Sequence, residues 1–149
     1  MRNLQDAVIN TLRARFPEMG TSIRSLNVEL DDTTESQVSY PAPGILVTVI
    51  NAEEVPEEFA PWELRCNLGA VIAVKQASAD KRDAEGWRLT TRVGECVYRN
   101  LFGLSALYFR PAVITNMNRN IVRTPDGMPT GVSYWTSTFY IWAKFEGLF

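Results

Sequence analysis

The C-terminal part of the chain alternates between two sets of side chains from residue 132 to residue 145. A period of two predicts a β-strand, and this one is more than twice as long as the common length of about 5–6 residues. From Phe139 onward both faces carry large apolar groups, so both need a cover. One face would carry Val132, Tyr134, Thr136, Thr138, Tyr140, Trp142 and Lys144, and the other Ser133, Trp135, Ser137, Phe139, Ile141, Ala143 and Phe145.

Two interpretations of this strand are open. It is either a long central strand of a twisted sheet or a strand whose far end is completed by another subunit, because an aromatic edge strand is an aggregation hazard unless something pairs with it. We expect the side with Trp135, Phe139, Ile141 and Phe145 to face the helices, since its second half is the more uniformly apolar. Trp142 would then face a neighbouring subunit.

The chain begins with a pattern of apolar residues at a spacing of four, which predicts an amphipathic helix. Asn3 and Asp6 resemble a capping box at its start, and Pro17 and Gly20 signal its end. A short strand should follow, with Ile23, Leu26, Val28 and Leu30. The apolar positions of the helix are Leu4, Val8, Leu12 and Phe16, widened by Ala7.

Two further strands are expected in the middle of the chain. The apolar, β-branched run at residues 45–50 predicts a strand that is covered on both faces. Residues 51–61 are acidic and bounded by proline, which predicts a loop. Alternation resumes over residues 62–74, where Gly69 predicts a bulge or bend.

The period then changes, and residues 79–100 predict a second helix. Gly86 and Gly94 would permit close packing of this helix against the sheet. Residues 112–123 predict a strand, and residues 124–131 predict a hairpin loop from which the last strand returns antiparallel. The apolar face of the helix would hold Trp87, Leu89, Val93, Cys96, Val97 and Leu101.

No repeat or linker divides the chain, so residues 1–149 should form a single domain. The expected fold class is α+β: a single mixed, mainly antiparallel β-sheet with two main α-helices packed on it. Apolar residues make up 46% and charged residues 21%, which is ordinary for a soluble globular protein. Neither a membrane-spanning run nor a signal sequence is found, so we expect the chain to remain in the cytoplasm of the cell that makes it.

Histidine is absent from the sequence. Its absence excludes Ser–His and Cys–His nucleophile chemistry and most zinc sites. Cys66 and Cys96 are expected to be small buried hydrophobes, and no phosphate-binding or metal-spaced motif is present. We therefore expect no enzyme, no catalytic residue, no cofactor and no metal. Carboxylate or Mg²⁺ chemistry stays open at two acidic clusters that are more typical of solvated loops: Glu29, Asp31, Asp32 and Glu35, and Glu53, Glu54, Glu57 and Glu58.

The net charge is only −2, but the charges are unevenly distributed. Residues 29–63 hold nine acidic residues and no basic one, whereas residues 96–125 hold four arginines and no acid. If the two halves lie on different faces, they favour a head-to-tail contact that can close into a ring. The candidate interface residues are Trp142, Tyr140, Tyr134, Arg110, Arg119, Arg123, Glu53, Glu54, Glu57 and Glu58.

Five segments in order resemble one family over nearly the entire chain: the helix MRNLQDAVINTLRARF, the strands PAPGILVTV and WELRCNLGAVIAV, the helix WRLTTRVGECVYRNLFG and the strand GVSYWTSTFYIWAKFE. The layout is similar to that of the small tail terminator, or tail-completion, proteins of long-tailed, Mu-like bacteriophages. The resemblance rests on the order and pattern of the elements, without a diagnostic short motif.

This resemblance implies an α/β fold and a hexameric ring that caps the tail tube at its head-proximal end. Its partners would be other copies of the chain, the tail tube protein and the head connector or neck protein. DNA would be met only in a central channel, and no membrane would be involved. The protein would be located in the virion, after assembly in the host cytoplasm.

Two other classes of function remain open. A head–tail neck or tail tube subunit would share the small sheet-and-helix body and the ring assembly. A small-molecule-binding or enzymatic α+β domain could use the Trp- and Tyr-rich sheet together with a carboxylate. Native mass separates these classes, because a ring predicts about six chains and a ligand-binding domain predicts one or two.

Overall fold

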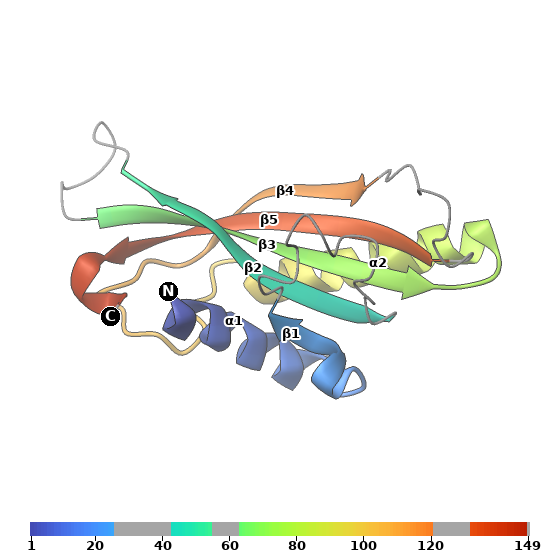
Figure 1. Cartoon of the computed structure of the whole chain (residues 1–149), viewed down its shortest axis with the longest axis horizontal. Coiled ribbons are helices and arrows are strands. Elements are labelled where there is room, and N and C mark those ends of the chain that lie inside the picture. Colours follow the sequence, from blue (N-terminus) through green and yellow to red (C-terminus); the bar gives the residue numbers. More distant parts are fainter. Residues whose placement is uncertain (26–42, 55–62, 121–131, 149) are drawn as a thin grey trace, which may run out of the picture.

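The computed structural model describes residues 1–25, 43–54, 63–120 and 132–148, which form a sheet with helices on one side (Figure 1). The α-helices are α1 (Arg2–Arg15) and α2 (Ala79–Val97). Short 3₁₀ turns span Gly20–Ser22 and Phe145–Gly147. The strands are β1 (Ile23–Ser25), β2 (Gly44–Glu53), β3 (Glu63–Lys75), β4 (Val113–Asn120) and β5 (Val132–Lys144).

The strands form one sheet in the order β1-β2-β3-β5-β4. The pair β1–β2 is parallel, and the other three pairs are antiparallel. This arrangement confirms the predicted fold class, an α+β sheet of mixed but mainly antiparallel strands with two helices packed against it. The last two strands also return antiparallel to each other, as predicted.

The long strand β5 lies inside the sheet, between β3 and β4. It pairs with β3 over its whole length. Beyond the end of β4 its other edge is completed by the chain itself, through a bridge from Phe109 to Ala143 and a 2.8 Å hydrogen bond from the Lys144 amide to the Tyr108 carbonyl. The interpretation of a central strand is therefore confirmed, and completion of its edge by another subunit was wrong.

The two faces of β5 divide as its alternation predicted. Trp135, Phe139 and Ile141 are buried on the face that the helices cover. Phe145 is exposed, contrary to the prediction, because the strand ends at Lys144 and Phe145 begins a 3₁₀ turn that breaks the period of two.

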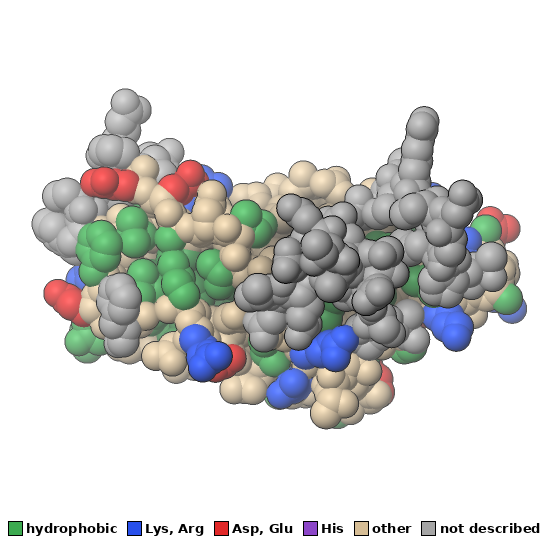
Figure 2. Space-filling model, viewed as in Figure 1, with side chains coloured by type: hydrophobic (Ala, Val, Ile, Leu, Met, Phe, Trp, Pro, Cys, Tyr) green, Lys and Arg blue, Asp and Glu red, His purple; other side chains and the backbone are tan. Residues whose placement is uncertain are grey.

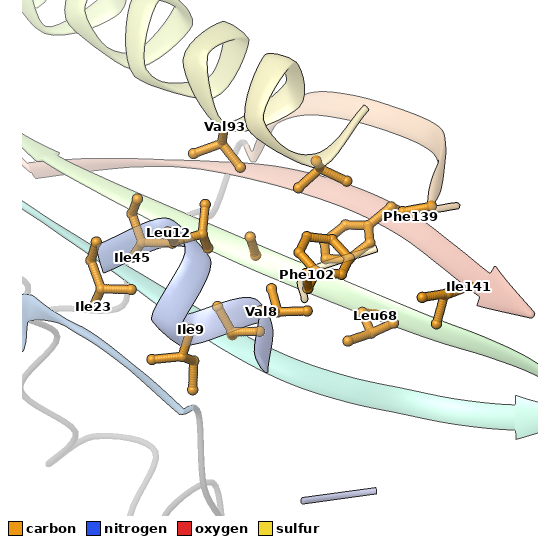
Figure 3. Packing of buried hydrophobic residues seen from close by; sticks show 14 of the residues in the cluster. Val8, Ile9, Leu12, Ile23, Ile45, Leu68, Val93, Phe102, Phe139 and Ile141 are labelled. Atoms are coloured by element: carbon orange, nitrogen blue, oxygen red, sulfur yellow. The ribbon is translucent and has the colours of Figure 1, made fainter. Parts of the chain in front are cut away.

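Both helices cover the same face of the sheet: α1 packs on β1 and β2, and α2 packs on β3, β5 and β4 (Figure 1). The predicted apolar stripe of α1 is confirmed, and Ile9 joins it. Figure 3 shows how the α1 side chains face the sheet, with Phe102 beside Phe139 at a ring-centroid distance of 6.1 Å. The buried residues of this helix and its C-cap are Leu4, Val8, Ile9, Leu12 and Phe16.

The predicted capping box of α1 was wrong. The helix begins at Arg2, with Met1 at the N-cap position and no side-chain capping bond. The Met1 ammonium donates a 2.9 Å hydrogen bond to the Leu148 carbonyl. The first turn of α1 thus lies beside a hydrogen bond between Met1 and Leu148, and the capping box that the sequence suggested is not formed.

Helix α2 buries most of the apolar face that was predicted, including Leu89, Val93 and Val97, but Trp87 does not belong to it. Trp87 is 40% exposed, and Gly86 and Gly94 face the sheet, where Trp135 and Met117 pack against them. The close packing expected at the two glycines is confirmed, and Trp87 was wrongly placed in the core. The large indole that fills this space comes from β5. The buried residues of the helix are Gly86, Leu89, Thr90, Val93, Gly94 and Val97.

Strand β2 is longer than predicted and carries the irregularity that was expected in β3. It continues to Glu53, whereas residues 51–61 had been predicted as a loop. The register shifts between Val49 and Asn51, while β3 runs without a break through Gly69. Gly69 instead leaves room for Ile50, whose Cδ1 lies 3.4 Å from the place that a Cβ on Gly69 would take.

Coverage on both faces is confirmed for the first part of β2, where Ile45, Leu46 and Val47 are all buried. The start of the first predicted short strand is observed as β1; Leu26, Val28 and Leu30 and the predicted hairpin loop at residues 124–131 lie outside the described residues. Within the described residues, no helix is both long enough and apolar enough to cross a membrane.

Candidate interaction surface

The face of the sheet opposite the helices is called the open face here. Pairing across the strands places Glu53, Arg65 and Trp142 in one row and Asn51, Asn67 and Tyr140 in the next. The helices lie on the opposite face, where α2 packs against Trp135 and Met117 (Figure 1). The open face therefore brings charged, amide and aromatic side chains together near the end of β5. We call these six residues the Arg65 cluster.

Arg65 lies at the centre of the cluster. Its Nε donates a 3.1 Å hydrogen bond to Asn67 Oδ1 and lies 3.7 Å from Glu53 Oε1. Its guanidinium carbon lies 4.0 Å from the centroid of the Tyr140 ring. A guanidinium over an aromatic face combines electrostatic attraction with stacking. The guanidinium of Arg65 is thus held over the Tyr140 ring by contacts with one carboxylate and one amide.

The amides extend this network to β2. Asn67 Nδ2 donates to Asn51 Oδ1 at 2.7 Å and to Glu53 Oε1 at 3.1 Å. These bonds are exposed to solvent. They hold the outer half of β2 to β3 and leave Glu53 with a half-exposed carboxylate.

The aromatic part of the cluster comes from β5. Tyr140 and Trp142 form an edge-to-face pair with ring centroids 6.1 Å apart and an angle of 81° between the rings. Tyr140 is half-buried, whereas Trp142 is only 5% exposed. A neighbouring subunit would therefore find Tyr140 accessible and little of Trp142 left to cover.

A second ion pair borders the cluster. Arg110 donates to Glu63 Oε1 at 3.1 Å, and its backbone amide donates to the Trp142 carbonyl at 3.0 Å. Glu63 is 6% exposed, and its Oε2 is buried without a hydrogen-bond partner. The half-exposed Arg110 thus compensates a carboxylate that the fold has largely removed from water.

The structure brings some of the predicted interface residues together and separates others. Tyr140, Trp142, Glu53 and Arg110 meet at this end of the open face, and exposed Glu54 follows Glu53. In Figure 2 hydrophobic side chains gather on the half of the molecule where β5 ends, with acidic and basic side chains at their margin.

The other predicted residues lie elsewhere. Tyr134 belongs to the open face but lies near the opposite end of β5, paired with Ala73, and is buried. Arg119 lies on the helix side, where its Nη1 is 3.2 Å from Asp83 Oδ1 of α2. Arg123, Glu57 and Glu58 lie outside the described residues.

The two charge halves do not remain separate within the fold. Arg110 comes from the basic half and Glu63 from the acidic half, yet they form an ion pair inside one subunit. Glu53 is paired with Arg65. Within these two halves, the described charged residues with exposed side chains are Glu53, Glu54, Arg99, Arg110 and Arg119.

Sequence reasoning missed Arg65, Asn67 and Asn51. The signal was present, because Glu63, Arg65 and Asn67 occupy alternate positions of a strand whose other side is apolar. Only the apolar half of that alternation had been used. The polar half marks the face that the helices do not cover.

The two cysteines are separate thiols. Cys66 is buried on the helix side, and burial raises the pKa of its thiol to about 11. Cys96 is half-buried, and desolvation also raises its pKa. The prediction of a buried hydrophobe is confirmed for Cys66 and holds only in part for Cys96.

Two open grooves border α1, and both include Thr11 and Ala14 of this helix. One continues to Phe102 and Leu104, and the other to Cys96. A typical ligand site is an enclosed, apolar cavity with a few convergent polar groups, which these open grooves do not resemble. In the ranges described, no three His, Cys, Asp or Glu residues lie close enough to hold a metal ion.

No protein-family model and no curated protein sequence matches this chain. The candidate surface must therefore be interpreted from its own geometry. A guanidinium stacked on an accessible tyrosine, bordered by amides and half-exposed carboxylates, has the composition of a protein contact surface, in which Arg, Tyr and Trp are enriched.

Proposed function

We propose that this chain is a structural virion protein, a tail terminator whose copies form a hexameric ring. The ring would cap the tail tube at its head-proximal end and join it to the head connector. The family resemblance in the sequence supports this proposal. So does the order of the elements, because α1, β2, β3, α2 and β5 fall on the five segments that carry the resemblance.

The observation that carries the proposal is the Arg65 cluster on the open face. Tyr140 is a rigid, flat side chain of the kind that provides contact area at a low cost in conformational entropy, and the contacts of Arg65 already restrict its guanidinium. The bordering amide and carboxylate groups can form hydrogen bonds with a partner. Such a surface supports association with another protein rather than enclosure of a small molecule.

The first test is the native mass of the purified protein, together with negative-stain images. A ring with a central hole is expected. Association should weaken as salt rises, because exposed charges at the contact are screened with a Debye length of about 10 Å at 0.1 M salt. A protein that stays monomeric at high concentration and low salt would contradict the proposal.

A second experiment separates a terminator from a tail tube or neck subunit. Purified tail tube protein is allowed to polymerise with and without the chain. A terminator stops the growth of the tubes, is found at one tube end and forms no tubes alone. A tail tube subunit would polymerise by itself, and a neck subunit would bind the connector without stopping tube growth.

A further inference from the structure

Each side of the sheet ends in a stretch of strand without a described outer partner. On one side β4 pairs with β5 and with no other strand of the described residues. On the other side β1 covers β2 from Ile45 to Val47, and Gln5 Nε2 donates a 2.8 Å hydrogen bond to the Val47 carbonyl. Residues 48–53 of β2 lie beyond this cover. Unpaired strand edges are ready templates for pairing with another chain.

The exposed charged side chains of the two edges have opposite sign, although Arg119 is paired with Asp83 and Glu53 with Arg65 inside the subunit. Arg119 is the charged residue of β4, its side chain is 50% exposed, and residues 96–125 contain no acid. The free part of β2 ends in Glu53, whose side chain is 46% exposed, and exposed Glu54 follows. Opposite charge favours the meeting of unlike edges from two copies and opposes the meeting of like edges.

Exposed apolar side chains lie at both edges. Val113 and Met117 of β4 and Ile50 of β2 are each more than one-third exposed. Trp87 lies on the side of α2 that faces β4, since Asp83 and Gly94, at helical spacing from it, contact Arg119 and Met117. A strand added outside β4 would therefore have Trp87 and Met117 available beneath its side chains.

We propose that the outer edge of β4 in one copy pairs with residues 48–53 of β2 in a second copy, so that the sheet continues from subunit to subunit. Each copy offers one edge of each kind, so the contact is head-to-tail and can close into a ring. This inference rests on the proposed function, since it assigns the contact by which the copies of the ring meet.

The strand directions are compatible with this pairing. β2 and β5 run the same way, because each is antiparallel to β3, and β4 runs opposite to β5. A neighbouring sheet in the same orientation therefore presents its β2 antiparallel to β4. Antiparallel pairing is the slightly more stable arrangement per residue.

The test is cross-linking between two single-cysteine variants. Asn118→Cys places a thiol on β4, opposite Thr136, and Asn51→Cys places one on β2, opposite Asn67; both lie on the open face. Ala52→Cys is the matched control, because the neighbouring position points to the other face. All variants carry Cys96→Ser, while Cys66 is retained because burial raises the pKa of its thiol to about 11.

The variants are treated alone and as mixtures with a short bifunctional thiol reagent, after native mass has been measured. The mixture of Asn118→Cys and Asn51→Cys should give several-fold more covalent dimer than either variant alone, and several-fold more than Asn118→Cys with Ala52→Cys. Equal yields from Asn51→Cys and Ala52→Cys would overturn the strand pairing.

Three other outcomes show which part of the proposal is wrong. Dimers formed as readily by Asn118→Cys alone would show that β4 meets β4, which overturns the head-to-tail contact. An oligomer that forms without the mixed cross-link would reject the edge pairing and leave the ring proposal standing. A monomeric parent protein would reject both.

Discussion

Gly86 of α2 lies directly against the indole of Trp135 on β5. A Cβ at position 86 would overlap the six-membered part of that indole. Trp135 is completely buried, so the ring has no free space into which it could move. The distance between α2 and the sheet is therefore set by a glycine and a tryptophan in contact.

We expect Gly86→Ala to destabilise the subunit. Overpacking of a well-packed core costs about 1–3 kcal/mol, whereas the higher helix propensity of alanine returns about 1 kcal/mol. The net free energy of unfolding should fall, which urea denaturation would measure.

Gly94→Ala is the matched control. Its Cβ would meet Met117 Sδ at 2.9 Å, but that thioether is flexible and partly exposed and can move away. The loss should be clearly smaller than for Gly86→Ala. Equal losses at both positions would show that contact with the indole does not control the packing of α2.

Trp135→Ala should lower the stability of the subunit by about 3–5 kcal/mol, the usual cost of removing a large core aromatic residue. Trp142→Ala should also lower it, because Trp142 is 5% exposed and packs edge-to-face on Tyr140. Thermal melting of both variants tests this. A Trp142→Ala variant that melts like the parent chain would contradict its burial.

Tyr140→Ala should weaken association more than folding. Tyr140 is half-buried and carries the stacked Arg65 guanidinium, so its loss removes the flat centre of the proposed contact surface. A contact residue of this kind contributes about 2 kcal/mol or more to association. Native mass against concentration measures the change.

Thr136→Ala provides the control for Tyr140→Ala. Thr136 belongs to the same strand and the same face and is also half-buried, but it lies outside the Arg65 cluster. Its substitution should leave association unchanged. An equal effect of both variants would place the contact elsewhere on the open face.

Arg110→Ala should cost more stability than Glu63→Gln. Without Arg110 the buried Glu63 carboxylate loses its ion-pair partner, and an uncompensated buried polar group costs about 1–3 kcal/mol. A neutral amide at position 63 needs less compensation. Urea denaturation of both single variants and the double variant gives the coupling between the two residues; a coupling near zero would mean that the pair is not formed in solution.

The Glu85–Arg88 pair predicts a small pH dependence. The hydrogen bond from Arg88 lowers the pKa of Glu85 below its ordinary value of 4.5. The stabilisation is therefore present above pH 4.5 and is lost as the pH falls through the lower pKa of the folded state. The Arg88 side chain is 52% exposed and the Glu85 side chain 33% exposed, so solvent screens the pair and about 0.2–1 kcal/mol is expected.

The measurement compares the stability of Glu85→Gln with that of the parent chain at neutral and acid pH. The parent should be slightly more stable at neutral pH, and the difference should vanish in acid. A difference that persists in acid would show that the effect of the substitution does not come from the charge of Glu85.

The local pattern of the sequence was sufficient for the element types and for the faces of β5. Alternation along a strand is a property of the backbone itself, so Trp135 and Trp142 had to lie on opposite faces whatever the strand paired with. The stripe of α1 and the fold class followed in the same way, from periods of 3.6 and 2. The prediction that Phe145 is buried was wrong only because β5 ends at Lys144, one residue before it.

Tertiary packing decided the features that depend on distant residues. Trp87 fits the apolar pattern of α2, but Trp135 already fills the space beside Gly86, so the helix turns Trp87 outward. The bulge at Ile50 depends on how β2 and β3 align, and the start of α1 coincides with a contact to Leu148.

The candidate surface was also predicted only in part from the sequence. Tyr140, Trp142 and Glu53 could be named from their residue types, because aromatic and charged residues at the end of a strand suggest a contact. Their assembly around Arg65 required the register of β2, β3 and β5, which side chains far apart in the sequence determine together. A local pattern assigns each residue to a face, and only the pairing of strands decides which neighbours it meets there.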